Sequence, residues 1–484
     1  MTVTESPRVQ DRLGREVWVV AAVVIVGVIM SILDTTIVNV ALETLARDLK
    51  SPLSTIQWVS AGYLLALAMV IPLAGWTSER FGSKRVWMVS VAVFGVGSAL
   101  CGLAWSAGSL IGFRIFQGFG GGMIMPVGMA LLAQTAGPSR VGRVMSVVGV
   151  PMLLGPVLGP VLGGLIVSNI SWRWIFYVNV PIAVLALMLA ARLLHRDSGR
   201  ADAGRLDWLG VSLLSPGLVG VVFGLSEIET HGGIGAPIAF GPIVAGVVLV
   251  ALFVLHSARA TRPLVDVRLF RSHGFSAAAA TTFLIGAALF GAMIILPLYY
   301  QVARHTSALT AGLLMAPQGL GAAALMPLAG RLTDRIGGGI VAFVGACVMA
   351  LGTIPFAFVG AHTSYLLLAL VLVVRGAGLG STMMPAMAAA YAVLTHAEVP
   401  RATSALNAIQ RVGGSLGTAL LAVVLQHEFS ATLPGQAGGG GLGQVSHAAV
   451  PGASARLAEA FAHTFWWALG LSILAGGSAL ALAL

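Results

Sequence analysis

The stretch Ser31-Ile-Leu-Asp34-Thr-Thr-Ile-Val-Asn39-Val-Ala-Leu42 places a carboxylate inside a long apolar run that begins near Val17. About 20 apolar residues cross a bilayer as a helix, so this run predicts a membrane-spanning segment. A carboxylate at that depth costs at least ~2.5 kcal/mol, which marks Asp34 as a candidate functional residue. The alternative is an acid that only pairs with a neighbouring helix.

The composition of the whole chain is that of a multi-pass membrane protein. Of its 484 residues, 57% are hydrophobic and 9% are charged, and the mean hydropathy is +0.94. The net charge of +10 does not indicate nucleic-acid binding, because the basic residues are spread over short segments between apolar runs. Cys101 and Cys347 both lie in apolar runs, which supports neither a disulfide framework nor a metal site.

Apolar runs of suitable length predict an all-α fold with fourteen transmembrane helices. Their approximate spans are residues 17–41, 53–74, 86–104, 109–131, 143–167, 173–193, 207–226, 237–256, 274–300, 308–329, 340–360, 364–386, 402–427 and 462–484. Nineteen of the 27 lysines and arginines fall on one side of these spans and five on the other. Because basic residues concentrate in cytoplasmic loops, we expect both termini in the cytoplasm. Arginine far outnumbers lysine, and alanine and glycine are abundant, a composition that favours a GC-rich bacterial source. We therefore expect the protein in the inner membrane.

An internal repeat divides the chain. Gly75-Trp-Thr-Ser-Glu79-Arg80-Phe-Gly82 and Gly330-Arg-Leu-Thr-Asp334-Arg335-Ile-Gly337 share the pattern G-x3-acid-Arg-x-Gly, 255 residues apart. Gln117-Gly-Phe-Gly-Gly-Gly is echoed by Arg375-Gly-Ala-Gly-Leu-Gly. Two parallel six-helix pseudo-repeats explain both pairs, and such repeats with a midplane site between them are a transporter architecture.

The repeat predicts the domain boundaries. We expect a cytoplasmic N-terminus (1–16), an N-terminal six-helix bundle (17–193), a linker with two inserted helices (194–272), and a C-terminal six-helix bundle (273–484) with an outer loop at 428–461. Within that loop, Ala453–His463 has the pattern of a short interfacial helix. The segment Gly75–Arg85 is expected to be a tight loop, in which Glu79 caps the next helix or pairs with an arginine across the repeat boundary.

The span at 143–167 carries Gly155-Pro156-Val-Leu-Gly159-Pro160-Val-Leu-Gly163. Its glycines share one helix face, which predicts close packing against another helix. Its prolines each remove a backbone donor and favour a bend.

These motifs, together with Arg114-Ile-Phe-Gln-Gly118 and Trp172-Arg-Trp-Ile-Phe-Tyr-Val-Asn-Val-Pro181, resemble the major facilitator superfamily. The set is similar to its fourteen-helix drug:proton antiporter branch over essentially the whole chain. The resemblance implies alternating access. In that family the 143–167 motif is associated with exporters rather than importers, and Asp34 and Arg114 correspond to residues associated with proton coupling. Two features depart from the family pattern: Glu79 replaces an aspartate, and Gly338 and Gly339 replace basic residues.

The seventeen acids can be placed one by one, and only Asp34 lies within a predicted span away from its ends. Asp34 is therefore the best candidate proton carrier. At 1.5 Å per residue, Asp34 and Arg114 lie at similar depths, so Arg114 is the expected partner. The alternative for Arg114 is a side chain that extends to the outer interface.

Ten residues are candidates for the substrate cavity, with ordinary interhelical packing as the alternative for each. They are Asn39, Gln57, Tyr63, Gln117, Met123, Met293, Gln318, Arg375, Asn407 and Arg411. The methionines would supply an adaptable apolar wall. We expect Arg375 and Arg411 to bond to carbonyls and glutamines, and the alternative is an anionic ligand.

The sequence therefore predicts a proton-coupled antiporter that exports lipophilic drugs or metabolites by alternating access. Family members that export divalent cations are associated with an additional acid in the span that corresponds to 308–329, and 307–328 contains none, so the resemblance implies monocationic or neutral substrates. The alternative is export of a lipid or amphiphilic natural product by the same machinery. Expected partners are the lipid bilayer, a small lipophilic substrate and protons, with no cofactor, metal or nucleic acid, in a monomer. A membrane enzyme is disfavoured, since no nucleophile–base set is present.

Overall fold

A computed structural model describes residues 14–137, 140–195, 199, 204–231, 237–395, 398–432 and 453–484. The first eight helices are α1 (Arg15–Asp48), α2 (Leu53–Val70), α3 (Leu73–Phe81), α4 (Ser83–Gly102), α5 (Ala107–Ala136), α6 (Val141–Asn169), α7 (Trp174–Tyr177) and α8 (Asn179–Leu193). The inserted pair is α9 (Trp208–His231) and α10 (Pro237–Arg259). The remaining elements are η1 (Val267–Arg271), α11 (His273–Leu298), η2 (Tyr299–Ala303), α12 (Ala308–Ile336), α13 (Gly338–Thr353), η3 (Ile354–Phe358), α14 (Tyr365–Ala392), α15 (Val399–Thr432) and α16 (Ala453–Ala483).

The fold is all-helical, and every apolar run predicted from the sequence coincides with a helix or a broken helix. Among the described residues, twelve helices are long and apolar enough to span a membrane, or thirteen if the bent pair α2–α3 counts as one span. α6 is a further 29-residue helix outside that count. The predicted total of fourteen spans is therefore not confirmed as a number.

The segment Gly75–Arg85 is not the loop that we expected. α3 continues the path of α2 after a 56° bend and includes Glu79. The turn is confined to Gly82, whose φ of 87° lies in the left-handed region that glycine adopts without strain. In the second copy α12 likewise runs through Asp334, and the turn is at Gly337 with φ 91°. Both acids thus project from helix ends.

The separate interfacial helix expected at Ala453–His463 is also wrong. These residues form the first turns of α16, which continues unbroken to Ala483. The apolar side chains of Leu457 and Phe461 are buried against aromatic residues of the C-terminal half, which explains why the segment joins the bundle. The Gly-rich stretch 434–443 lies outside the described residues.

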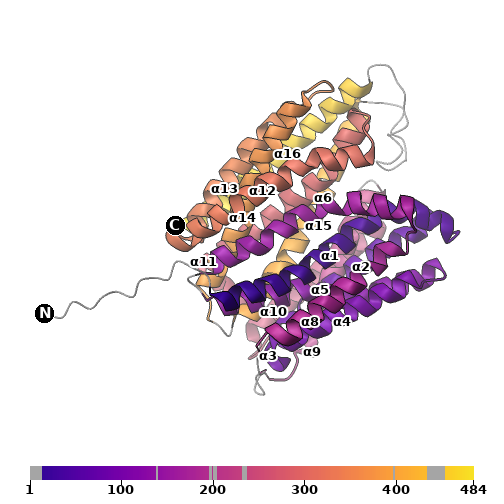
Figure 1. Cartoon of the computed structure of the whole chain (residues 1–484). Coiled ribbons are helices and arrows are strands. Elements are labelled where there is room, and N and C mark those ends of the chain that lie inside the picture. Colours follow the sequence, from indigo (N-terminus) through magenta and orange to yellow (C-terminus); the bar gives the residue numbers. More distant parts are fainter. Residues whose placement is uncertain are drawn as a thin grey trace.

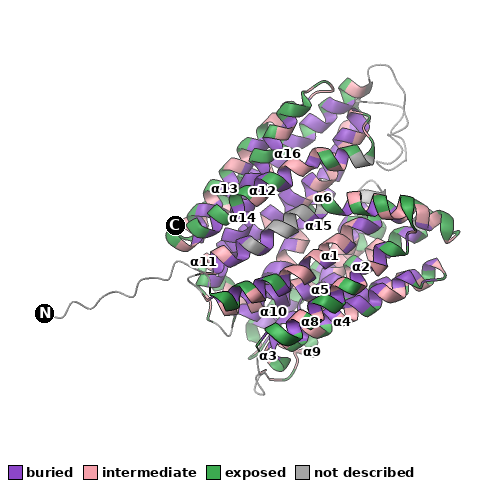
Figure 2. Ribbon diagram, viewed as in Figure 1, coloured by how far each residue is buried: buried purple, intermediate pink, exposed green. Residues whose placement is uncertain are grey.

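Two bundles make up the molecule, and they diverge toward one end (Figure 1). α6 lies between them and packs against both α1 and α12. α9 packs against α2 and α15, with Trp58 stacked on Phe223 at 5.8 Å between ring centroids. The helices carry both buried and exposed residues (Figure 2). The buried residues lie where helices pack together, whereas many large apolar side chains are exposed on the surface.

Candidate functional site

Asp34 lies in α1 with 0% of its side chain exposed, and three side chains donate hydrogen bonds to it. Arg114 Nη1 donates to Oδ2 at 2.6 Å. Gln117 Nε2 and Asn179 Nδ2 both donate to Oδ1, at 3.0 and 2.9 Å. Every one of these bonds needs an acceptor, so the arrangement fits the deprotonated carboxylate.

Arg114 in α5 is the second charge of this cluster, and 1% of its side chain is exposed. Its Nη1 also donates to Gln117 Oε1 at 2.8 Å, and its Nε donates to the Val59 carbonyl at 3.1 Å. The guanidinium carbon lies 3.9 Å from the centre of the Tyr63 ring, a cation–π distance. Arg114 therefore points into the N-terminal bundle and not toward the outer interface.

Glycines bring the helices close enough for this cluster to close. Gly118 faces the Tyr63 carbonyl of α2, where an added Cβ would lie at 2.8 Å. Gly97 of α4 faces the Gln117 backbone, with an added Cβ at 2.7 Å from its Cα. The Gly-rich run of α5 thus lets α2 and α4 approach, which buries the polar side chains between helices.

Asn179 and Ser98 belong to the cluster, although they were not among the predicted site residues. Asn179 Nδ2 also donates to Ser98 Oγ at 3.1 Å, and Ser98 donates to the Phe176 carbonyl at 2.8 Å. Both side chains are buried. A signal for Asn179 was present, because it lies in the Trp172–Pro181 run that supports the family resemblance.

Several predicted cavity residues are placed elsewhere. Tyr63 and Gln117 are fully buried, so in this structure they belong to the Asp34 cluster and do not line an open cavity. The close packing of α5 on α2 is the reason. Met123 and Met293 are half-buried at the edge of the main hydrophobic core.

The remaining predicted cavity residues differ in exposure. Asn39 and Gln57 are exposed, and Asn39 Oδ1 accepts a hydrogen bond from Ser60 Oγ at 3.1 Å. Asn407 is buried and donates to the Thr403 carbonyl of its own helix at 2.9 Å. Arg411 is half-buried on α15.

Arg375 occupies the place in the C-terminal half that Gln117 has in the N-terminal half. Its side chain is 2% exposed. It donates to Gln318 Oε1 at 2.5 Å and to the Ala288 carbonyl at 3.3 Å. These are the glutamine and carbonyl partners that we expected, and they leave Arg375 paired with no carboxylate among the described residues.

An ion pair joins the two halves at the ends of α3 and α15. Arg401 Nη2 donates to Glu79 Oε2 at 2.8 Å, and both side chains are 16% exposed. Gly75 lies directly against Arg401, where an added Cβ would be 2.8 Å from its Cα. Arg80, next to Glu79, is exposed at the helix end.

A second ion pair has the same arrangement, but here the arginine belongs to the N-terminal half and the acid to the C-terminal half. Arg143 Nε at the start of α6 lies 3.6 Å from Asp334 Oδ2 at the end of α12. Gly330 lies against Arg143, with an added Cβ at 2.9 Å from its Cα. Arg335 is exposed, as Arg80 is. Both ion pairs lie on the predicted cytoplasmic side and hold the halves together there.

The pairing of Glu79 with an arginine across the repeat boundary, one of the two expectations for this residue, is confirmed. The two arginines themselves were not identified, although a sequence signal exists. Val141-Gly-Arg143-Val-Met-Ser146 and Val399-Pro-Arg401-Ala-Thr-Ser404 share the pattern V-x-R-x-x-S, 258 residues apart. Gln117 and Arg375 are separated by the same distance. Each copy of the repeat thus contains one acid and the arginine that pairs with the acid of the other copy.

The glycine face of α6 packs on α1, close to Asp34. Gly155, Gly159 and Gly163 are all buried. A Cβ at Gly155 would overlap Ile32 Cγ2, and a Cβ at Gly159 would lie 2.6 Å from Thr36 Cβ. Close approach of helices is what such a face predicts. The side chains of Pro156 and Pro160 lie outside the described residues.

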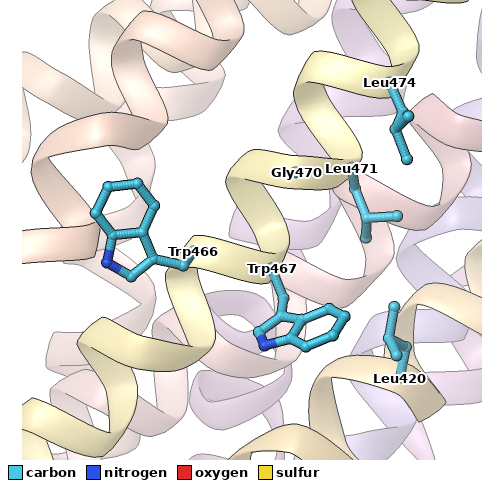
Figure 3. A pocket seen from close by; sticks show the side chains of 6 residues that line it. All are labelled: Leu420, Trp466, Trp467, Gly470, Leu471 and Leu474. Atoms are coloured by element: carbon cyan, nitrogen blue, oxygen red, sulfur yellow. The ribbon is translucent and has the colours of Figure 1, made fainter.

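An apolar hollow of about 340 Å³ lies on the outside of α15 and α16 (Figure 3). Its lining residues are Leu420, Trp466, Trp467, Gly470, Leu471 and Leu474. Trp466 and Trp467 are exposed. None of the sequence-predicted site residues contributes to this hollow, so it is separate from the polar cluster.

Comparison with known proteins identifies the family. The Major Facilitator Superfamily matches residues 24–418. The multidrug resistance protein B homolog of Mycobacterium tuberculosis (strain ATCC 25618 / H37Rv) is 43% identical over 423 residues, covering 87% of this chain and 78% of the relative. The multidrug export protein EmrB of Haemophilus influenzae (strain ATCC 51907 / DSM 11121 / KW20 / Rd) is 32% identical over 394 residues, covering 81% and 77%.

Solved structures show the same fold. The human organic anion transporter MFSD10 (TETRAN) aligns with a TM-score of 0.60 at 15% identity, covering 95% of this chain and 100% of that chain. At that identity the likeness concerns the fold alone. On the family match and the multidrug relatives, this chain belongs to the Major Facilitator Superfamily and is a multi-pass membrane transporter, not an enzyme.

Proposed function

We propose that the protein is a proton-coupled antiporter that exports lipophilic drugs or metabolites across the bacterial inner membrane by alternating access. The observation that carries the proposal is the buried Asp34–Arg114 pair at 2.6 Å, in which 0% and 1% of the two side chains are exposed. The multidrug exporters among its relatives support the direction and the kind of substrate.

The geometry suggests how a proton would do work. Protonation of Asp34 removes the negative charge and part of the acceptor capacity that Arg114, Gln117 and Asn179 use. A buried arginine that loses its counter-charge is costly, by about 3–5 kcal/mol in measured cases. The protonated cluster must therefore rearrange, and helices α1, α5 and α8 that carry it would move relative to one another.

We infer which state of the transport cycle this conformation represents. The Glu79–Arg401 and Asp334–Arg143 pairs join the halves on the predicted cytoplasmic side, and the bundles diverge toward the other side (Figure 1). We infer that this state is closed to the cytoplasm and that proton uptake by Asp34 favours breaking these contacts. Proton entry supplies roughly 2.3 kcal/mol per 100 mV for each charge.

The absence of an acid in the 307–328 segment favours monocationic or neutral substrates over dications. Export of a lipid or amphiphilic natural product would use the same coupling and is the second candidate from the sequence. Purified protein in proteoliposomes separates them. A lipophilic monocationic dye is expected to release protons from wild-type vesicles, and release with lipids alone would support the second candidate. No substrate-dependent proton flux with any of these would contradict antiport.

A further inference from the structure

One face of α15 is polar. Ser404, Asn407, Arg411, Ser415 and Thr418 follow one another at intervals of three or four residues, which places them on the same side of a helix. Serine and threonine in a membrane helix commonly bond to their own backbone, and here Ser404 and Thr418 do so. The hydroxyls of Ser404 and Thr418 are thus satisfied within α15.

The other faces of α15 are occupied. Gly413, Gly414 and Gly417 lie against α11, with Gly417 directly against Ala287. Val412 packs with apolar residues of α9, and Leu420 lines the hollow beside α16. The polar face is therefore the one directed at the N-terminal half, whose helices α3 and α5 pack against α15.

Exposure along this face increases in one direction. Ser404 and Asn407 are buried, whereas Arg411, Ser415 and Thr418 are half-buried. Residue numbers rise from the side of the ion pairs toward the end where the bundles diverge (Figure 1). Arg411 is thus at the inner end of the part of the face that solvent or a ligand reaches.

The charge of Arg411 is not neutralised by a neighbouring acid. Among the described residues, the group on the opposite half with which it interacts electrostatically is Tyr63, and no carboxylate faces it. The guanidinium carbon of Arg114 lies 3.9 Å from the centre of the same Tyr63 ring. Arg411 therefore adds a positive charge, with no acidic partner among the described residues, to the face of α15 that is directed at the N-terminal half. Charged residues at membrane depth that face the interior of the protein are functional by default.

We propose that Arg411 sets the charge preference of the substrate site, so that each positive charge on a substrate weakens binding. This inference rests on the proposed export of lipophilic compounds and deepens it by naming a specificity-determining residue. At an effective dielectric constant of about 20 and a separation of about 12 Å, one unit charge changes a binding constant roughly tenfold. A dication is then disfavoured about a hundredfold, whereas a neutral compound is unaffected.

The test is equilibrium binding of four lipophilic probes that share one scaffold and carry charges of −1, 0, +1 and +2. Purified protein in nanodiscs is used, since binding needs no proton gradient. For Arg411→Gln we expect affinity relative to wild type to fall about tenfold for the anion, to stay the same for the neutral probe, and to rise about tenfold and a hundredfold for the two cations. Arg411→Lys, which keeps the charge, is expected to follow the wild type.

Equal changes for all four probes, or no change in any of them, would overturn the assignment. Loss of the dependence of affinity on probe charge in Arg411→Lys as well would also overturn it, because the shape of the Arg411 side chain and not its charge would then determine the affinities. These outcomes are distinct from a failure of proton antiport. If wild-type vesicles bind the probes but release no protons, the proposed proton coupling fails, whereas the dependence of affinity on probe charge is unaffected.

Discussion

Gly159 offers a graded test of whether α1 and α6 must stay in close contact for transport. A Cβ at this position would overlap Thr36 Oγ1 and lie 2.6 Å from Thr36 Cβ, where ordinary contact is 3.4–4 Å. The two helices would have to separate by about 1 Å, and overpacking of this kind costs about 1–3 kcal/mol. Thr36 is two residues from Asp34, so the displacement reaches the 2.6 Å bond to Arg114.

The same helix supplies matched controls. Gly163 faces the Ile37 carbonyl with an added Cβ at 3.1 Å, and Gly164 has nothing within 4 Å. We therefore expect transport to be nearly abolished in Gly159→Leu, strongly reduced in Gly159→Ala, mildly reduced in Gly163→Ala and normal in Gly164→Ala. Gly159→Leu is expected to reach the membrane at near wild-type levels, because lipid-exposed faces are unchanged.

Dye efflux from vesicles and thermal unfolding in detergent measure the two effects separately. We expect the four variants to rank in the same order in both assays. Relative to wild type, the efflux rate is expected to fall by a larger fraction than the unfolding temperature. If Gly159→Leu transports at the wild-type rate, or if Gly164→Ala is as damaging as Gly159→Ala, close packing at this face is not required and the reasoning fails.

Two further predictions concern the ion pairs and Asn179. Glu79→Gln is expected to slow efflux more than Asp334→Asn, because the Glu79 pair is a 2.8 Å hydrogen bond whereas the Asp334 pair is 3.6 Å apart; the exchange Glu79→Arg with Arg401→Glu is expected to restore part of the rate, and no recovery in the double variant would argue against a direct pair. Asn179→Leu removes a 2.9 Å donor from the Asp34 carboxylate, so the rate of efflux driven by a pH gradient is expected to fall. Asn179→Asp places a second carboxylate beside Asp34 and is expected to lower the rate further; equal rates for the two variants would reduce Asn179 to a packing role.

Much of the helical fold follows from the sequence because membrane helices are constrained by bilayer thickness and by hydropathy. The bend between α2 and α3 could not be located, since helix α3 is more polar than a membrane span and resembles a charged loop. Its continuation depends on tertiary contacts such as Gly75 against Arg401, which join residues 326 positions apart.

The Asp34–Arg114 contact could be expected from depth alone, because both residues are isolated charges in apolar helices. Asn179 could not be found in this way, since a neutral amide leaves no charge to match. Tyr63 and Gln117 were predicted to line the cavity because they are polar, but polarity does not distinguish a residue facing substrate from one that supports a buried charge. Their place depends on how closely α5 approaches α2.

The central claim is that Asp34 carries the coupled proton, and Asp34→Asn tests it most directly. This change keeps the shape but removes the titratable group, and it leaves Arg114 without its counter-charge. The measurement is uphill dye efflux from vesicles driven by an imposed pH gradient, with exchange of internal for external dye as the control for an intact binding site. We predict that Asp34→Asn retains exchange but loses uphill efflux, while Asp34→Glu retains part of both. Uphill efflux by Asp34→Asn would contradict the account and leave Glu227, near the end of α9, as the next acid to examine.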